Sequence, residues 1–95
     1  MNSVHKNILQ TSCTYLIDNI ANIEGICDYL IAVEILDTGL QDTILTKSPK
    51  SKEQIRELIY NQLPKGGPMA FDCFIKALIN TNQEYIADHL NEQLP

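Results

Sequence analysis

Cysteine and histidine are the residue types in this chain that could act as nucleophile and base, and their setting decides whether they do. A thiol from Cys73 and an imidazole from His89 could form such a pair. A reactive thiol needs an electropositive, partly open site, whereas both residues fall on the apolar flanks of predicted helices. The pattern therefore favours structural roles for both, and we expect the chain not to be an enzyme.

Metal-binding residues are present but scattered. Neither the Cys-x-x-Cys nor the His-x-x-x-His spacing of metal sites occurs among the five candidate ligands, which are His5, Cys13, Cys27, Cys73 and His89. An odd number of cysteines without short spacing fits reduced, buried thiols that act as small hydrophobic residues. We therefore expect no metal and no other cofactor.

Two short motifs point to other binding chemistries without the residues that these chemistries need. The Gly66-Gly67 pair could open a phosphate-binding loop, but no strand and no P-loop Lys-Ser/Thr accompanies it. Residues 37–40 (Asp-Thr-Gly-Leu) are similar to the Asp-Ser-Leu attachment site of acyl carrier proteins, which are also small, acidic and helical, but the serine is absent. A small helical carrier protein is therefore the least supported alternative.

The composition describes one domain with an acidic balance. With 95 residues, of which 44% are apolar, the chain can bury one hydrophobic core, and we expect residues 1–95 to form a single domain. The net charge of −5 argues against nucleic-acid binding. No apolar run approaches the ~20 residues of a membrane span, and the N-terminus lacks a signal-peptide pattern. We expect a cytoplasmic protein that binds no membrane.

The charges are unevenly distributed along the chain. No Lys or Arg lies between Asn7 and Thr46, where six of the twelve acidic residues lie, whereas five of the seven basic residues lie between Lys47 and Lys65. Solvated helix faces are the ordinary explanation for such charges. The alternative is a domain with two oppositely charged surfaces, which would act by binding partners through them.

Residues 66–79 form the segment around which the chain is organised. Two glycines break the preceding pattern, Pro68 suits a first helical turn, and nine of the eleven residues 69–79 are apolar. The two exceptions are four residues apart and therefore share one helix face. A helix with one thin polar seam is buried on most sides, so we predict a central helix over residues 68–80.

Five further helices follow from apolar residues at helical spacing. The first spans about residues 3–20, with a kink predicted near residues 11–14 because Ser and Thr side chains compete for backbone hydrogen bonds. The second begins after Asn22 and ends near Leu36. The others begin at three Ser/Thr-x-x-Gln/Glu patterns typical of capping boxes, at 38–41, 51–54 and 81–84. Either Asp37 or Thr38 can cap the first of these three helices. A loop is predicted at residues 46–50, and the six short helices make an antiparallel bundle.

The central segment resembles the fifth-helix region of caspase recruitment domains (CARDs), especially those of initiator caspases. Residues 64–78 (Pro-Lys-Gly-Gly-Pro-Met-Ala-Phe-Asp-Cys-Phe-Ile-Lys-Ala-Leu) share its basic residue, glycine and Ala-Phe pair, followed by an aromatic residue and Ala-Leu. Residues 81–90 are similar to the family's Thr-Gly-x-x-x-Leu-Ala-x-x-Leu ending, with Asn82 where glycine is common. The resemblance covers about residues 8–90, and its second and fourth helices match residues 28–37 and 51–58.

The resemblance implies an all-α death fold, a six-helix antiparallel Greek-key bundle with a kinked first helix. It implies homotypic assembly, in which a CARD of one protein binds a CARD of another. We therefore expect an interaction module that recruits or assembles initiator caspases, their scaffold or an adaptor in apoptotic or innate signalling, with self-association left open. The alternative is a stand-alone CARD-only inhibitor that caps such assemblies, given a chain that stops just past the domain and an incomplete basic face.

In the family's best-understood contact, a basic surface on helices one and four meets an acidic surface on helices two and three of the partner. The resemblance places Lys6, Lys50, Lys52 and Arg56 on the basic face, and Asp28, Glu34, Asp37 and Asp42 on the acidic face. Gln10 and Cys13 occupy positions that are often Arg in caspase CARDs, so the basic face is partial. A competing interpretation is that Lys52 and Arg56 only form intrahelical ion pairs with Glu53 and Glu57.

Overall fold

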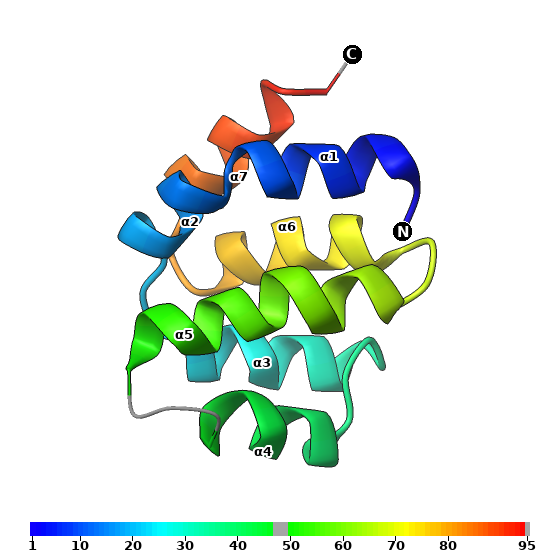
Figure 1. Cartoon of the computed structure of the whole chain (residues 1–95), viewed down its shortest axis with the longest axis vertical. Coiled ribbons are helices and arrows are strands. Elements are labelled where there is room, and N and C mark those ends of the chain that lie inside the picture. Colours follow the sequence, from blue (N-terminus) through cyan, green and yellow to red (C-terminus); the bar gives the residue numbers. More distant parts are fainter. Residues whose placement is uncertain (47–49, 95) are drawn as a thin grey trace.

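Short helices follow one another along the chain, and their bounds are close to those predicted from apolar spacing. The computed structural model describes residues 1–46 and 50–94, and it contains helices and no strand within them. Residues 47–49 of the predicted loop lie outside the described part. The elements in chain order (Figure 1) are α1 (Ser3–Thr11), α2 (Cys13–Asn19), α3 (Ile23–Ala32), α4 (Thr38–Thr46), α5 (Ser51–Arg56), η1 (Glu57–Gln62), η2 (Leu63–Lys65), α6 (Ala70–Asn80) and α7 (Glu84–Asn91).

The first predicted helix is broken where the kink is expected. Helix α1 ends at Thr11 and α2 begins at Cys13, and between them Ser12 has ψ near 3°, outside the helical range. The Thr11 hydroxyl donates hydrogen bonds to two carbonyl oxygens of the preceding turn, at 3.0 and 3.2 Å. A hydroxyl that competes for helix carbonyls bends the backbone, so the kink has a local cause, and α1 and α2 together are the first helix of the bundle.

The fourth predicted helix changes its winding along its length. It begins as α5, continues as a π-helix in η1 and ends as a 3-10 turn in η2. Pro64 in η2 has no N–H to offer the carbonyl of Tyr60 four residues earlier, which accounts for the tighter final turn. Lys65 is the last residue of η2, so the fourth helix ends directly before the two glycines that break the pattern in the sequence.

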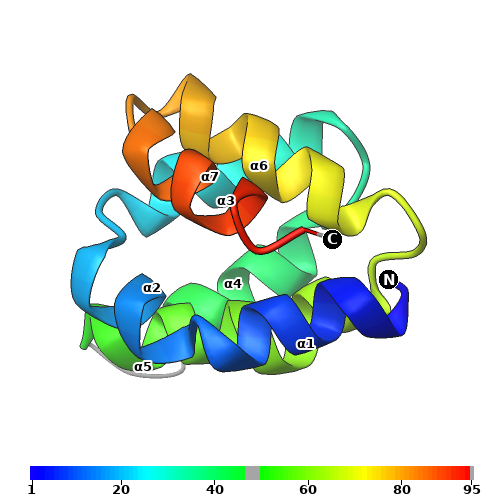
Figure 2. The ribbon, with the colours of Figure 1, turned by 90° about the horizontal axis from the view of Figure 1, so that it is seen from above.

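The helices form two sides of a bundle around a shared core. Figure 2 shows α1, α2 and α5 along one side and α3, α6 and α7 along the other, while Figure 1 shows α4 at the lower end. The central helix α6 makes its most extensive contacts with α3 and α7, and its Phe71 and Phe74 are fully buried. His5 of α1 stacks on Phe71 with ring centroids 4.2 Å apart, so α6 contacts both sides. The all-α death fold is confirmed.

The central helix ends at Asn80 as predicted but begins two residues later than predicted. It begins at Ala70, because Pro68 and Met69 form the turn before it, and Met69 serves as its N-cap residue. Its solvent-exposed side is wider than the two charged residues predicted, since the apolar Ile79 near its end is also 46% exposed.

Steric constraints explain why glycine occupies both positions 66 and 67 before α6. A Cβ at Gly66 would lie 2.9 Å from Cγ2 of Ile35, so the chain can pass the α3–α4 connection this closely only without a side chain. Gly67 has φ near +89°, a conformation that costs other residues energy. Gly67 therefore sets the turn that leads into α6.

The three predicted capping boxes are wrong. Of the two caps predicted for α4, Asp37 is confirmed and Thr38 is not, because Oδ1 of Asp37 accepts the N–H of Leu40 at 2.8 Å. Lys50 is the N-cap residue of α5 without a side-chain cap, and Thr81 ends α6 instead of starting α7. The glutamines that would close two of the boxes bind elsewhere, Gln41 donating to Asp28 (2.7 Å) and Gln54 to the Leu45 carbonyl (2.9 Å).

Helix α3 ends four residues earlier than predicted, at Ala32. Glu34 adopts a left-handed conformation with φ near 65°. Its N–H donates to the carbonyl of Ile31 at 3.0 Å, and the N–H of Ile35 donates to that of Leu30 at 2.8 Å. These two bonds form a Schellman cap, which terminates the helix. A β-carbon makes the left-handed conformation unfavourable, so no sequence signal announces this cap.

The same cap recurs at the end of α6 with a better-suited residue. Asn82 has φ near 64°, and the N–H of Gln83 donates to the carbonyl of Leu78 at 2.8 Å. Asparagine tolerates the left-handed region better than most residues. The departure from the glycine common in the resembling family therefore preserves the turn.

Gln83 joins two connections that are far apart in the sequence. It is 4% exposed, and its side-chain amide pairs with the backbone of Ala21 in both directions: Oε1 accepts the N–H at 2.7 Å and Nε2 donates to the carbonyl at 2.8 Å. Nε2 also lies 2.8 Å from the hydroxyl of Thr81. The amide thus holds the α2–α3 connection against the α6–α7 turn.

The cysteines are free thiols, as expected, but only two of them are buried. Cys13 and Cys27 lie in the core, whereas Cys73 is half-buried at its edge. Burial, with Asp28 and Glu24 nearby, raises the pKa of the Cys27 thiol to about 12. Cys27 therefore stays a protonated core residue at neutral pH.

We predict that Gln83→Ala lowers the free energy of unfolding by about 2 kcal/mol, because three hydrogen bonds are lost. Gln83→Glu should destabilise at least as much as Gln83→Ala, since its carboxylate can still accept the N–H of Ala21 but places a buried negative charge against the Ala21 carbonyl. Urea denaturation followed by circular dichroism measures both. Gln93→Ala, which truncates an exposed glutamine, is the matched control, and an equal effect of the two alanine variants would contradict the bridging role.

We predict that Glu34→Gly raises the free energy of unfolding by about 1 kcal/mol, because glycine relieves the left-handed backbone and a negative charge leaves the C-terminal end of α3. Glu34→Gln removes only the charge and should gain less. Asn82→Gly is the matched control at the equivalent position of α6, where a smaller gain is expected. Thermal denaturation of the four proteins measures the order, and an unchanged or lower midpoint for Glu34→Gly would contradict the strain.

Candidate functional site

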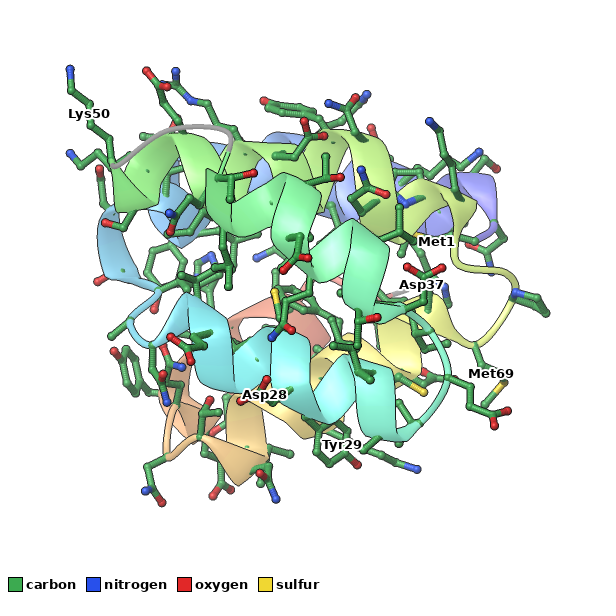
Figure 3. All side chains as sticks on the ribbon, turned by 90° about the horizontal axis from the view of Figure 1, so that it is seen from below. Met1, Asp28, Tyr29, Asp37, Lys50 and Met69 are labelled. Carbon is green, nitrogen blue, oxygen red and sulfur yellow. The ribbon has the colours of Figure 1, made fainter. Side chains whose placement is uncertain are left out.

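The four predicted acidic residues come from neighbouring elements. Asp28 lies on α3, Glu34 and Asp37 lie in the α3–α4 connection, and Asp42 lies on α4. All four side chains are exposed. Figure 3 shows Asp28 and Asp37 on the face of the bundle formed by α3 and α4. We call these four residues the acidic face.

Two members of the acidic face also serve the fold. Asp28 accepts a hydrogen bond from Gln41 at 2.7 Å, which joins α3 to α4, and Asp37 caps α4. Folding alone is therefore a sufficient explanation for these two. Glu34 is different, because its left-handed backbone and its place beyond the C-terminal end of α3 are both unfavourable for a glutamate. Stability does not explain Glu34.

The four predicted basic residues are less well gathered. Lys52 and Arg56 lie on α5, Lys50 precedes α5 and Lys6 lies on α1, and all are exposed. Figure 3 shows Lys50 at the edge of the view, away from Asp28. We call these four residues the basic face.

Part of the basic face is neutralised within the chain. The Nζ atom of Lys52 lies 3.6 Å from Oδ1 of Asp18 on α2, and the two side chains are 67% and 56% exposed. Such an exposed pair adds little stability, but it offsets the charge of Lys52. The ion pair shown here links two helices, unlike the intrahelical pairing with Glu53 considered from the sequence.

The position of Cys13, often Arg in caspase CARDs, is turned into the core in this chain. Cys13 is 6% exposed. Its interaction with Tyr60 of η1 is the main cause that raises the pKa of the Tyr60 hydroxyl, and the charge of Arg56 opposes the shift. Tyr60 itself is 47% exposed, so an aromatic ring stands beside Arg56 where a second basic residue is absent.

A shallow hollow of about 160 Å³ opens between α1 and η1, on the side of the basic face. It was not predicted from the sequence, because its walls come from segments about fifty residues apart and have no common motif. Leu9 and Ile59, each 1% exposed, are the most buried of its lining residues. The lining is Lys6, Leu9, Gln10, Ile59, Tyr60 and Pro64.

The residues considered for catalysis and metal binding pack against other side chains of the bundle. The ring of His89 stacks on Tyr15 of α2, with centroids 3.9 Å apart, and Cys73 is half-buried against the core. Over residues 1–46 and 50–94, no three His, Cys, Asp or Glu side chains gather as metal ligands would. In the same part of the chain, no helix has the length and apolar character needed to cross a bilayer.

Comparison with known protein families supports the helical fold of this chain. The family model described as caspase recruitment domain matches residues 6–93, which include every helix from α2 to α7 and most of α1. Neither the curated proteins nor the solved structures contain a match. CARDs are protein-interaction domains, not catalytic ones, and they bind other CARDs. Since the match covers almost the whole chain, this protein belongs to the CARD family and is a homotypic protein-interaction module.

Proposed function

We propose that this CARD binds a partner CARD through its acidic face and so recruits or assembles initiator caspases, or their scaffold or adaptor, in apoptotic or innate signalling. The observation that carries the proposal is the inequality of the two charged faces. The acidic face has four exposed carboxylates on adjoining elements. The basic face loses part of its charge to Asp18, and at Cys13 the chain has a buried thiol in place of a basic side chain.

Charge complementarity determines what such a face can do. Opposed charges speed the encounter of two proteins and fix their register more than they add affinity. A partner suited to the acidic face therefore carries a basic surface, which the CARDs of initiator caspases, as the resembling group, are expected to offer. We place the interaction in the cytoplasm.

Glu34 supports the proposal more strongly than its neighbours do. Its backbone strain and its position relative to the α3 dipole reduce stability, and its side chain is exposed. Residues retained at a cost to stability are commonly found where a protein binds or acts. We infer that Glu34 contacts the partner.

A second candidate function is that of a CARD-only cap. A heterologous contact propagates only if each molecule offers both complementary surfaces. The offset of Lys52 by Asp18 favours a domain that occupies a partner's basic face without extending the assembly. Light scattering of a mixture with a filament-forming partner CARD separates the two functions, because a cap stops particle growth and a recruiting module allows it.

We predict that Glu34→Lys weakens binding to a basic partner CARD at least about ten-fold, since a rim charge is reversed. Biolayer interferometry against a panel of purified CARDs of initiator caspases and their scaffolds measures the change. Asp88→Lys makes the same charge change on α7, away from the acidic face (Figure 1), and should bind as wild type does. Equal binding by Glu34→Lys would remove the acidic face from the interface.

We predict that raising the salt concentration from about 0.05 to 0.5 M weakens the binding of this protein to a basic partner CARD, because exposed charges are screened.

Arg56→Glu, at an exposed position, should leave thermal stability nearly unchanged, and it tests the basic face in the same assay. Loss of binding with Arg56→Glu but not with Glu34→Lys would move the interface from α3 and α4 to α5.

A further inference from the structure

Helix α1 joins the bundle through a small buried surface. Two of its nine residues, Ile8 and Leu9, are buried, whereas the central helix α6 buries six of its eleven. Val4, on the first turn of α1, is 44% exposed. Segments with few buried apolar side chains separate from a folded domain at a lower free energy than the whole domain unfolds. The contacts that α1 makes with its neighbours therefore decide how firmly it is held.

The contact between α1 and α6 includes a polar atom without a partner. The ring of His5 stacks on Phe71, with centroids 4.2 Å apart and an angle of 10° between the two planes. The Nδ1 atom of His5 is buried, and no hydrogen-bond partner for it occurs among residues 1–46 and 50–94. A buried nitrogen of this kind has lost its hydrogen bonds to water without replacement. Separation of α1 from α6 exposes Nδ1 to water again, which offsets part of the apolar contact that is lost.

The contact between α1 and η1 is incompletely filled. The hollow of about 160 Å³ lies between them, with Lys6 and Gln10 on its α1 side and Tyr60 on its η1 side. Side chains that border such a gap lose the dispersion contacts that a filled interface gives. Helix α1 is therefore held by imperfect contacts with both α6 and η1.

Ser12 provides a hinge between α1 and the helix that follows. It is the C-cap residue of α1 and the N-cap residue of α2, with ψ near 3° and no side-chain cap. Helix α2 is anchored independently of α1, because three of its seven residues are buried and its Asp18 pairs with Lys52 of α5 at 3.6 Å. Hinges in proteins are commonly a few residues at the ends of elements. A rotation at Ser12 therefore moves α1 without unwinding α2.

We propose that α1 undocks about Ser12 as one unit while the rest of the bundle stays folded. Lys6 is the member of the basic face that α1 carries, and the other three lie on or beside α5; Figure 2 shows α1 and α5 along the same side of the bundle. The basic face is therefore complete only while α1 is docked, and undocking also uncovers the ring of Phe71. This conformational device goes beyond the proposed function, which rests on the acidic face of α3 and α4.

Native-state hydrogen exchange, followed by NMR at guanidinium chloride concentrations below the unfolding transition, measures the opening. We expect the amides of residues 6–11 to exchange through one shared opening, whose free energy and denaturant dependence are both smaller than those of the amides of α6. The denaturant dependence is smaller because it scales with the surface that is exposed, and undocking one helix exposes less surface than unfolding the domain.

A substitution at His5 tests the contact that holds α1. His5→Phe keeps the ring on Phe71 and removes the unpartnered nitrogen, so the exchange of residues 6–11 should slow at least about five-fold. His89→Phe is the matched control, because the ring of His89 stacks on Tyr15 of α2 at 3.9 Å and that contact persists when α1 undocks. The control should leave the exchange of residues 6–11 unchanged. The wild-type measurement decides alone if His5→Phe does not fold.

Three results would overturn the proposal: amides of residues 6–11 that exchange only through global unfolding, at the free energy measured for α6; amides that exchange one by one without denaturant dependence, as at a fraying helix end; or a His5→Phe variant that fails to slow their exchange. Binding of a basic partner CARD by the acidic face is measured separately with Glu34→Lys. The proposed function therefore stands or fails independently of the undocking of α1.

Discussion

The burial of α6 is the constraint on which the rest of this structure depends. Phe71 and Phe74 are 1% and 0% exposed, and losing such a side chain costs about 3–5 kcal/mol. Helix α3, which makes extensive contact with α6, turns its apolar stripe of Ile23, Ile26, Cys27 and Leu30 toward the core. Asp28 is then left on the outward side, where Gln41 of α4 binds it. The outward position of Asp28 on the acidic face is thus a consequence of how α3 packs on α6.

Features that repeat over many residues could be predicted from the sequence, whereas features that depend on one tertiary contact could not. The central helix, the helix order and the kink at Ser12 follow from apolar spacing and from local hydroxyl groups. The three capping boxes fail because a short pattern has to compete with distant partners: Gln41 and Gln54 bind across to other elements. The end of α3 was missed because Glu34 is an unusual residue for a left-handed cap.

For the acidic and basic faces too, some features could be predicted from the sequence and others depend on tertiary contacts. The eight charged residues that the resemblance assigns to the two faces are all exposed, as charged side chains on helix faces usually are. It could not reveal that Lys52 is matched by Asp18 or that Cys13 is buried beside Tyr60, because both depend on how α2 packs against α5 and η1. The hollow of about 160 Å³ is likewise a product of packing. Charge assigned from a family pattern therefore overstates the basic face of this chain.

The two left-handed caps separate stability from function more sharply than the charges do. Both end a helix with the same pair of backbone hydrogen bonds, and both have φ near 65°. Asn82 suits that conformation, so its presence needs no further explanation. Glu34 does not suit it, and a neighbouring exposed valine adds apolar surface at the same corner. The strained backbone of Glu34 supports the proposed contact with a partner, because residues held in unfavourable backbone conformations cluster at sites where proteins bind or act.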